Sequence, residues 1–316
     1  MVRHIFSCVA VIFTLQLIGI GCSFLFVFYW SVHFALFNKF YAAEELVGQV
    51  LILALLLFSI FVVNFIVKRN KITGTNSFPL MYYALLTVIF PETLADSNAI
   101  FSSFFLLLAS RRLLSMRSLK NIKFKIFDST LWILVSTLFY DWAILFLLLV
   151  FAAIYFYQPK IKKNWLVPFA AGFTFFMITE CVLVLANSQD FLANHYQFKF
   201  YPNMVYFSYW GHSTKLICYV LGTFLAGLIA FLKLGKGSVG QVVTMRLIAL
   251  SFIIGIVLNV LKLSDNVYPI MVTFFPAVVF FTKYIESIRR PNIKEIILMV
   301  SIALPFLVFA SSMALK

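Results

Sequence analysis

Four carboxylates are the first residues in this sequence whose types and spacing could support chemistry. Glu44 and Glu45 are adjacent, ahead of a long apolar run, and Glu92 and Asp96 lie in a second polar interval, Pro91–Ala99. If these carboxylates converged, they could deprotonate a hydroxyl group or bind a divalent cation. The alternative is local: acidic residues are favoured in the first turn of a helix, and Asp96 is one of three residues that can cap the next helix.

A second group of polar residues could bind a substrate. Asp141 lies in a very short interval between two apolar segments, and Glu180 lies deep inside another apolar segment, where a carboxylate is costly and is therefore a functional candidate. The interval 187–215 adds aromatic and basic residues, among them His195, Lys199, Trp210, His212 and Lys215. Aromatic faces can stack on sugar rings and lysines can meet a phosphate. The alternatives are a helix cap, a paired glutamate and an aromatic belt at the membrane interface.

The most concentrated run of positive charge is 111–125. Its six cations are Arg111, Arg112, Arg117, Lys120, Lys123 and Lys125. Apolar residues recur at every third position between them, which predicts an interfacial helix on an anionic membrane surface. The run could anchor the topology, bind an anionic lipid head group or bind an acidic partner. Nucleotide-binding loops, serine-hydrolase elbows and zinc-protease helices are absent from the sequence.

Composition identifies the kind of protein that must position these residues. The 316 residues are 63% hydrophobic and 11% charged, with a mean hydropathy of +1.01. A soluble protein of this length could not cover so much apolar side chain with polar surface. This composition excludes a soluble enzyme, a nucleic-acid-binding module and a disordered chain. It predicts an all-α, polytopic membrane protein that forms one integral membrane domain over residues 1–316.

Hydropathy predicts about eleven spans, since a crossing helix needs about 20 apolar residues. The expected segments are 5–30, 46–67, 78–91, 97–114, 126–140, 142–157, 165–187, 204–232, 247–263, 266–283 and 295–313. The segments 78–91 and 126–140 are short enough to be broken, tilted or buried in protein. With this division, 20 of the 25 Lys and Arg residues fall on one side. The positive-inside rule therefore predicts a cytoplasmic N-terminus and, with eleven spans, an outer C-terminus. Seven of the eleven carboxylates fall on the outer side, a bias that this rule does not require.

Four stretches carry a resemblance to a known family: 94–98, 104–112, 127–132 and 140–142. Together they resemble an uncharacterised polytopic integral membrane family of Bacteroidota. More distantly, the layout of roughly residues 1–160 is similar to the polyprenyl-phosphate-sugar-dependent glycosyltransferases of the C-type fold. Those enzymes have an acidic residue in the first outer loop and an Arg-rich cytoplasmic turn between two later spans.

The resemblance implies a multi-pass protein of the bacterial inner membrane that acts on a lipid-linked sugar in envelope glycan assembly. Glu44 or Glu45 would then be the general base on an acceptor hydroxyl, and Lys199 or Lys215 would stabilise the departing phosphate. The expected partners are the lipid bilayer, a polyprenyl-phosphate-linked sugar and other membrane subunits, with no nucleic acid and no cofactor beyond an optional divalent cation. Two alternatives remain open: a non-catalytic subunit of an envelope complex, and a transporter or lipid flippase that uses Glu180 as a proton site.

Overall fold

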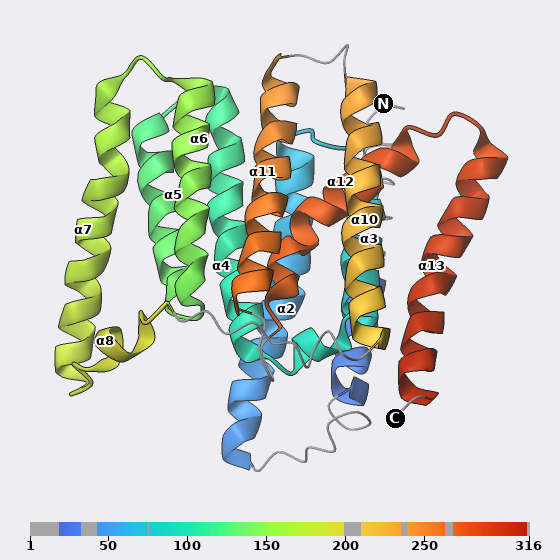
Figure 1. The fold of residues 1–316 in the computed structure, drawn as a ribbon, viewed down its shortest axis with the longest axis horizontal. Helices are drawn as coiled ribbons and strands as arrows, with labels where there is room; N and C mark the ends of the chain where they lie inside the picture. Colours follow the sequence, from blue (N-terminus) through green and yellow to red (C-terminus); the bar gives the residue numbers. More distant parts are fainter. Residues whose placement is uncertain are drawn as a thin grey trace, which may run out of the picture.

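The computed structural model describes residues 19–32, 43–74, 76–198, 210–234, 239–262 and 268–314. In this part of the chain every regular element is a helix, so the predicted all-α class is confirmed (Figure 1). A helix at Gly19–Val32 comes first. The α-helices that follow are α2 (Ala43–Arg69), α3 (Phe78–Ile89), α4 (Ser97–Leu114), α5 (Ile122–Thr137), α6 (Leu147–Tyr157), α7 (Lys162–Leu185), α8 (Phe191–His195), α10 (Trp210–Lys233), α11 (Val239–Lys262), α12 (Phe274–Glu286) and α13 (Pro291–Ala314). Short 3₁₀ helices join several of them: η1 (Pro91–Leu94), η2 (Ser115–Ser118), η3 (Asp141–Phe146) and η5 (Pro269–Thr273).

Within the described residues, each apolar segment predicted from hydropathy overlaps a helix, but the predicted count of eleven crossings is not confirmed. Within the described residues, seven helices are long and apolar enough to cross a membrane. They are Val47–Arg69, Ser97–Ser118, Lys162–Leu185, Ser213–Lys233, Val239–Lys262, Pro269–Glu286 and Pro291–Ala310. Helix length explains why a predicted segment such as 78–91 is not among these seven. Helix α3, which it overlaps, has 12 residues and rises only about 18 Å. The hydrocarbon core of a bilayer is about 30 Å thick, so this helix is too short to cross it.

The core of the molecule lies around α4, which packs against α2 and α5. Small residues line this contact, and the hydroxyl oxygens of Ser102 and Ser136 lie 2.8 Å apart across it. Gly255 likewise allows α11 to approach η5 closely, because a β-carbon at this position would come within 2.7 Å of the Thr273 side chain. Small residues let helices approach closely where lipid leaves little hydrophobic drive for association.

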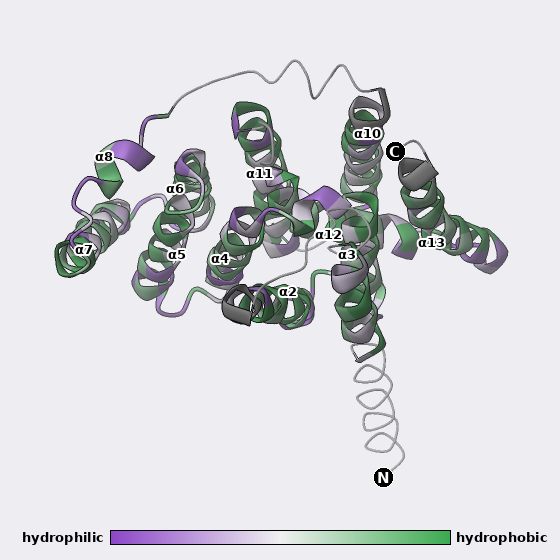
Figure 2. Cartoon of the chain, turned by 90° about the horizontal axis from the view of Figure 1, so that it is seen from below, coloured by the Kyte–Doolittle hydropathy of each residue, from purple (hydrophilic) through white to green (hydrophobic). Residues whose placement is uncertain are grey.

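Helices α7 and α13 form opposite edges of the bundle in both views (Figures 1 and 2). They are apolar on most of their surface, as the colouring of Figure 2 shows. Large side chains such as Leu166, Phe169 and Phe173 on α7 and Met299 and Leu307 on α13 are exposed. Exposed apolar surface of this extent fits contact with the lipid bilayer.

The two ends of the bundle differ in charge. The connections α2–α3, α4–α5, α6–α7 and α12–α13 share the upper end in Figure 1, which we name the cationic end. Glu92, Asp96 and Asp141 lie in connections at the opposite end, which we name the acidic end. The expectation from the positive-inside rule, that the cationic end faces the cytoplasm, stays a prediction.

Candidate functional site

Asp96 holds three parts of the acidic end together. It is the N-cap of α4, and its carboxylate accepts a hydrogen bond from the Ala99 amide at 3.2 Å. The hydroxyl of Tyr140 donates to the same carboxylate at 2.5 Å, and the backbone amide of Tyr268 donates at 2.8 Å. The aspartate is only 6% exposed and Tyr140 only 1%. The structure therefore gives this predicted catalytic residue three hydrogen-bond donors.

Asp141, at the start of η3, is a buried carboxylate that pairs with a half-buried lysine. Its carboxylate lies 2.8 Å from the Nζ atom of Lys262, at the end of α11, and accepts a hydrogen bond from the Trp142 amide at 3.0 Å. Asp141 is 2% exposed. Lys262 was not predicted from the sequence as a site residue, although a lysine on the carboxylate-rich side was a signal that could have found it.

Glu92 and Lys215 form a second ion pair at this end, between η1 and α10. The Nζ atom of Lys215 lies 2.8 Å from the Glu92 carboxylate, and both side chains are largely buried. The predicted contact of Lys215 with a phosphate stays a prediction, since in this structure the lysine binds a carboxylate. Glu92, Asp96 and Asp141 are thus each engaged by a cation or by hydrogen-bond donors.

The other predicted site residues of this end are only partly covered by the structure. Glu44 and Glu45 lie in the first turn of α2, and Trp210 and His212 lie at the start of α10, but their side chains are outside the described part. Lys199 lies outside the described residues altogether. Whether Glu44 and Glu45 meet Glu92 and Asp96 therefore stays a prediction.

The segment after α7 returns to the end of α5. The His195 ring nitrogen Nε2 lies 2.7 Å from the Thr137 carbonyl oxygen, and the hydroxyls of Tyr196 and Thr137 lie 2.6 Å apart. The His195 ring also stacks on Phe191, with ring centres 5.1 Å apart. Burial raises the pKa of Tyr196 above its usual value, although its hydrogen bond with Thr137 opposes the shift. These contacts fix α8 across the gap between α5 and α7.

A lateral groove of about 680 Å³ lies between α5 and α7. It is lined by Arg112, Asp128, Leu131, Trp132, Val135, Leu138, Phe139, Phe175, Ile178, Thr179, Val182, Leu183 and Phe191. At its cationic end, a guanidinium nitrogen of Arg112 lies 3.0 Å from the Asp128 carboxylate, and at its acidic end Phe191 of α8 closes it. Glu180 is half-buried on α7, next to the lining residue Thr179. The groove was not predicted from the sequence, because hydropathy does not reveal where two apolar helices diverge.

The cationic run 111–125 is not the interfacial helix that its spacing predicts. The chain leaves α4 at Leu114, forms η2, and turns through Leu119 and Asn121, which adopt left-handed backbone angles with φ of 53° and 51°. An α-helix does not continue through left-handed residues. Residues 111–114 therefore end α4, residues 115–121 form a turn, and residues 122–125 begin α5.

The cations of this turn mainly contact the protein itself. The guanidinium of Arg111 lies 4.8 Å from the centre of the Phe65 ring. Arg117 donates to the Asn70 carbonyl at 3.3 Å, and the Lys125 ammonium donates to the Ser115 carbonyl at 2.6 Å. Lys120 and Lys123 are exposed and are the members of the run that are free to face a membrane surface.

Among the described residues, no three His, Cys, Asp or Glu side chains are grouped so that they could hold a metal ion. Comparison of the chain with protein-family models, with curated proteins and with solved structures finds no match.

Proposed function

We propose that this chain binds one lipid-linked molecule, a polyprenyl-phosphate-linked sugar, with the lipid tail in the groove between α5 and α7. The groove itself is the observation that carries the proposal. Its lining begins at Asp128 on α5 and continues to Phe139, two residues beyond the end of that helix. From Asp128 to the end of α5 at Thr137 the helix rises about 14 Å. Water in such an apolar space would find few hydrogen-bond partners, whereas a hydrocarbon chain needs none. The groove therefore suits a lipid tail better than water.

The tail would enter sideways from the bilayer, because α7 is exposed along most of its length. Its head group would lie at the acidic end, beyond Phe191, where His195 and Tyr196 meet the end of α5. Hydrogen-bonding groups and aromatic rings lie together there, a combination that can bind a sugar. The proposed setting is the outer face of a bacterial inner membrane, in envelope glycan assembly.

Two activities are compatible with such a site. In the first, the chain is glycosyltransferase-like, and Glu44 or Glu45 removes the proton of an acceptor hydroxyl while the phosphate leaves. In the second, the chain is a non-catalytic subunit that presents the lipid-linked sugar to a partner. The second is favoured by one observation: Glu92, Asp96 and Asp141 are each held by cations or hydrogen-bond donors.

Narrowing the groove tests the proposal. Val182→Trp places a large ring at a lining position, and Val184→Trp places the same ring at an exposed position of α7 that does not line the groove. The assay is cross-linking of a photoactivatable polyprenyl phosphate to the purified full chain in lipid nanodiscs. We expect the first variant alone to lose most of the cross-link. Equal labelling of the two variants would overturn the proposal.

A second experiment distinguishes the transferase activity from the subunit activity. The double variant Glu44→Gln/Glu45→Gln should bind the lipid as before and lose sugar transfer if the chain is a transferase. If the wild-type chain binds the lipid yet transfers no sugar until a partner protein is added, the subunit activity is the correct one.

A further inference from the structure

The cationic end holds a second lateral pocket, on the far side of the bundle from the groove. It lies between the end of α10 and the start of α13 and has a volume of about 920 Å³. Helix α13 packs mainly on α3 and stands away from α10 (Figure 1). The pocket therefore opens sideways, between two helices whose outer faces are apolar.

Three cations line this pocket: Lys233, Arg289 and Arg290. Both arginines are exposed. The lysine is held in place, because its ammonium group donates a hydrogen bond to the Ser287 carbonyl at 2.8 Å. None of the described lining residues is acidic, so the pocket carries an uncompensated positive charge.

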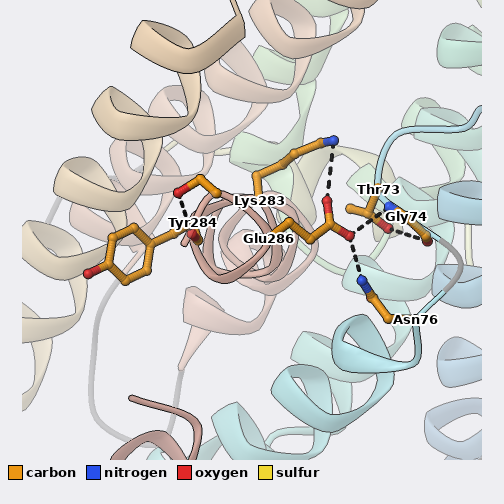
Figure 3. A network of polar contacts seen from close by, with 7 residues as sticks. Thr73, Gly74, Asn76, Lys283, Tyr284 and Glu286 are labelled. Carbon is orange, nitrogen blue, oxygen red and sulfur yellow. Dashed lines mark hydrogen bonds and ion pairs between the residues drawn. The ribbon is translucent and has the colours of Figure 1, made fainter. Parts of the chain in front are cut away.

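The nearest carboxylate in sequence, Glu286, faces the other way. Its Oε1 atom accepts hydrogen bonds from the Gly74 amide and the Asn76 side chain, each at 2.6 Å, and its Oε2 atom lies 3.4 Å from Lys283. Figure 3 shows this group on one side of α12 and the ring of Tyr284, which lines the pocket, on the other. The remaining carboxylate of this region, Glu295, is exposed on α13 and does not line the pocket.

Apolar side chains complete the pocket. Leu232, Ile288 and Ile293 lie among the cations, and Leu232 is 82% exposed. A free anion would gain nothing from these residues, whereas a lipid would place its head group on the cations and the first part of its chains on the apolar side chains.

We infer that this pocket binds the phosphate head group of an anionic phospholipid from the cytoplasmic leaflet. The inference is independent of the proposed function, because the pocket shares no residue with the groove between α5 and α7. A cation near an anionic lipid contributes about a five-fold gain in affinity. Loss of both arginines should therefore weaken binding by about 10- to 30-fold.

The test compares two double variants of the full chain in a neutral detergent. Arg289→Gln/Arg290→Gln removes two charges from the pocket, and Lys162→Gln/Lys163→Gln removes two exposed charges from the start of α7 at the same end. Binding of phosphatidylglycerol, measured by native mass spectrometry, should weaken in the first variant and stay unchanged in the second. Equal weakening in both would mean general surface attraction and would overturn the assignment.

Two further measurements distinguish a lipid site from a misfolded variant and from simple anion binding. Ile293→Trp fills the apolar part without changing the charge and should also reduce phosphatidylglycerol binding, which guards against misfolding of the arginine variant. Phosphatidylglycerol should raise the thermal unfolding midpoint of the wild-type chain more than phosphatidylcholine or inorganic phosphate does. If either control ligand matches it, the pocket is not a site for an anionic lipid.

Discussion

Asp96→Ala is the substitution that most directly tests how the acidic end is built. The carboxylate accepts hydrogen bonds from Ala99, Tyr140 and Tyr268, which belong to three different parts of the chain. Removing it deletes the N-cap of α4 and the partner of a phenol that is only 1% exposed. The effect should therefore be on stability as well as on any activity.

The magnitude follows from these contacts. Loss of an N-cap costs about 1 kcal/mol, and a hydrogen bond to a charged group contributes about 1.5–3 kcal/mol. With the phenol and one further amide affected, we expect the free energy of unfolding to fall by roughly 3–6 kcal/mol. Asp96→Asn keeps an acceptor for the cap and should cost only about 1–2 kcal/mol.

The assay is unfolding of the purified chain in mixed micelles of increasing SDS content, followed by circular dichroism. Asp190→Ala is the matched control, because Asp190 is an exposed aspartate of the same end and, although it is the N-cap residue of the short helix α8, its side chain makes no capping hydrogen bond. It should change the free energy of unfolding by less than about 0.5 kcal/mol. Tyr140→Phe should be far less costly in the Asp96→Ala background than in the wild type, since the two residues share one hydrogen bond. The reasoning is refuted if Asp96→Ala and Asp190→Ala unfold at the same SDS content.

Three other predictions use the same unfolding assay. Gly255→Ala should cost about 1–3 kcal/mol because the added carbon would overlap the Thr273 side chain, and combining it with Thr273→Ser should recover part of the loss. Glu286→Gln should cost about 1–2 kcal/mol because the hydrogen bond from the Gly74 amide loses its charged acceptor, and a shift no larger than that of Glu295→Gln would contradict this. Tyr196 keeps its proton in the fold to a higher pH than in the unfolded chain, since burial raises its pKa. The contribution of Tyr196 to the free energy of unfolding is therefore complete below about pH 10 and is lost above it. The free energy of unfolding of Tyr196→Phe should fall less steeply from pH 9 to pH 11 than that of the wild type.

The sequence predicted the helices well because membrane helices are encoded by apolar composition. Asp96 is one of the three residues expected to cap the helix after Pro91, and it is the cap. The number of crossings was harder to predict, because α3 is as apolar as a spanning helix yet has only 12 residues. Its short length is tolerated because nine of its residues are buried against other helices.

The contacts of the site could not be predicted because they join distant parts of the chain. The lysine that pairs with Asp141 is Lys262, and no local pattern connects a turn after one helix with the end of another. The cationic run 111–125 was misread for a local reason. Its three-residue spacing fits a helix, but Leu119 and Asn121 are left-handed, and leucine is not a residue that signals such a turn.

The position of α3 has a consequence for how the chain is made. Its neighbours are α2, which precedes it, and α12 and α13, of which α13 begins at Pro291, about 200 residues later. At a synthesis rate of roughly 5–20 residues per second, α3 waits about 10–40 s for its last neighbour to emerge. For that interval a helix too short to cross the bilayer by itself must be sheltered by lipid, by the insertion machinery or by α2. A chain stopped before α12 should therefore be a target for membrane proteases, because α3 is covered only once α12 and α13 have been made.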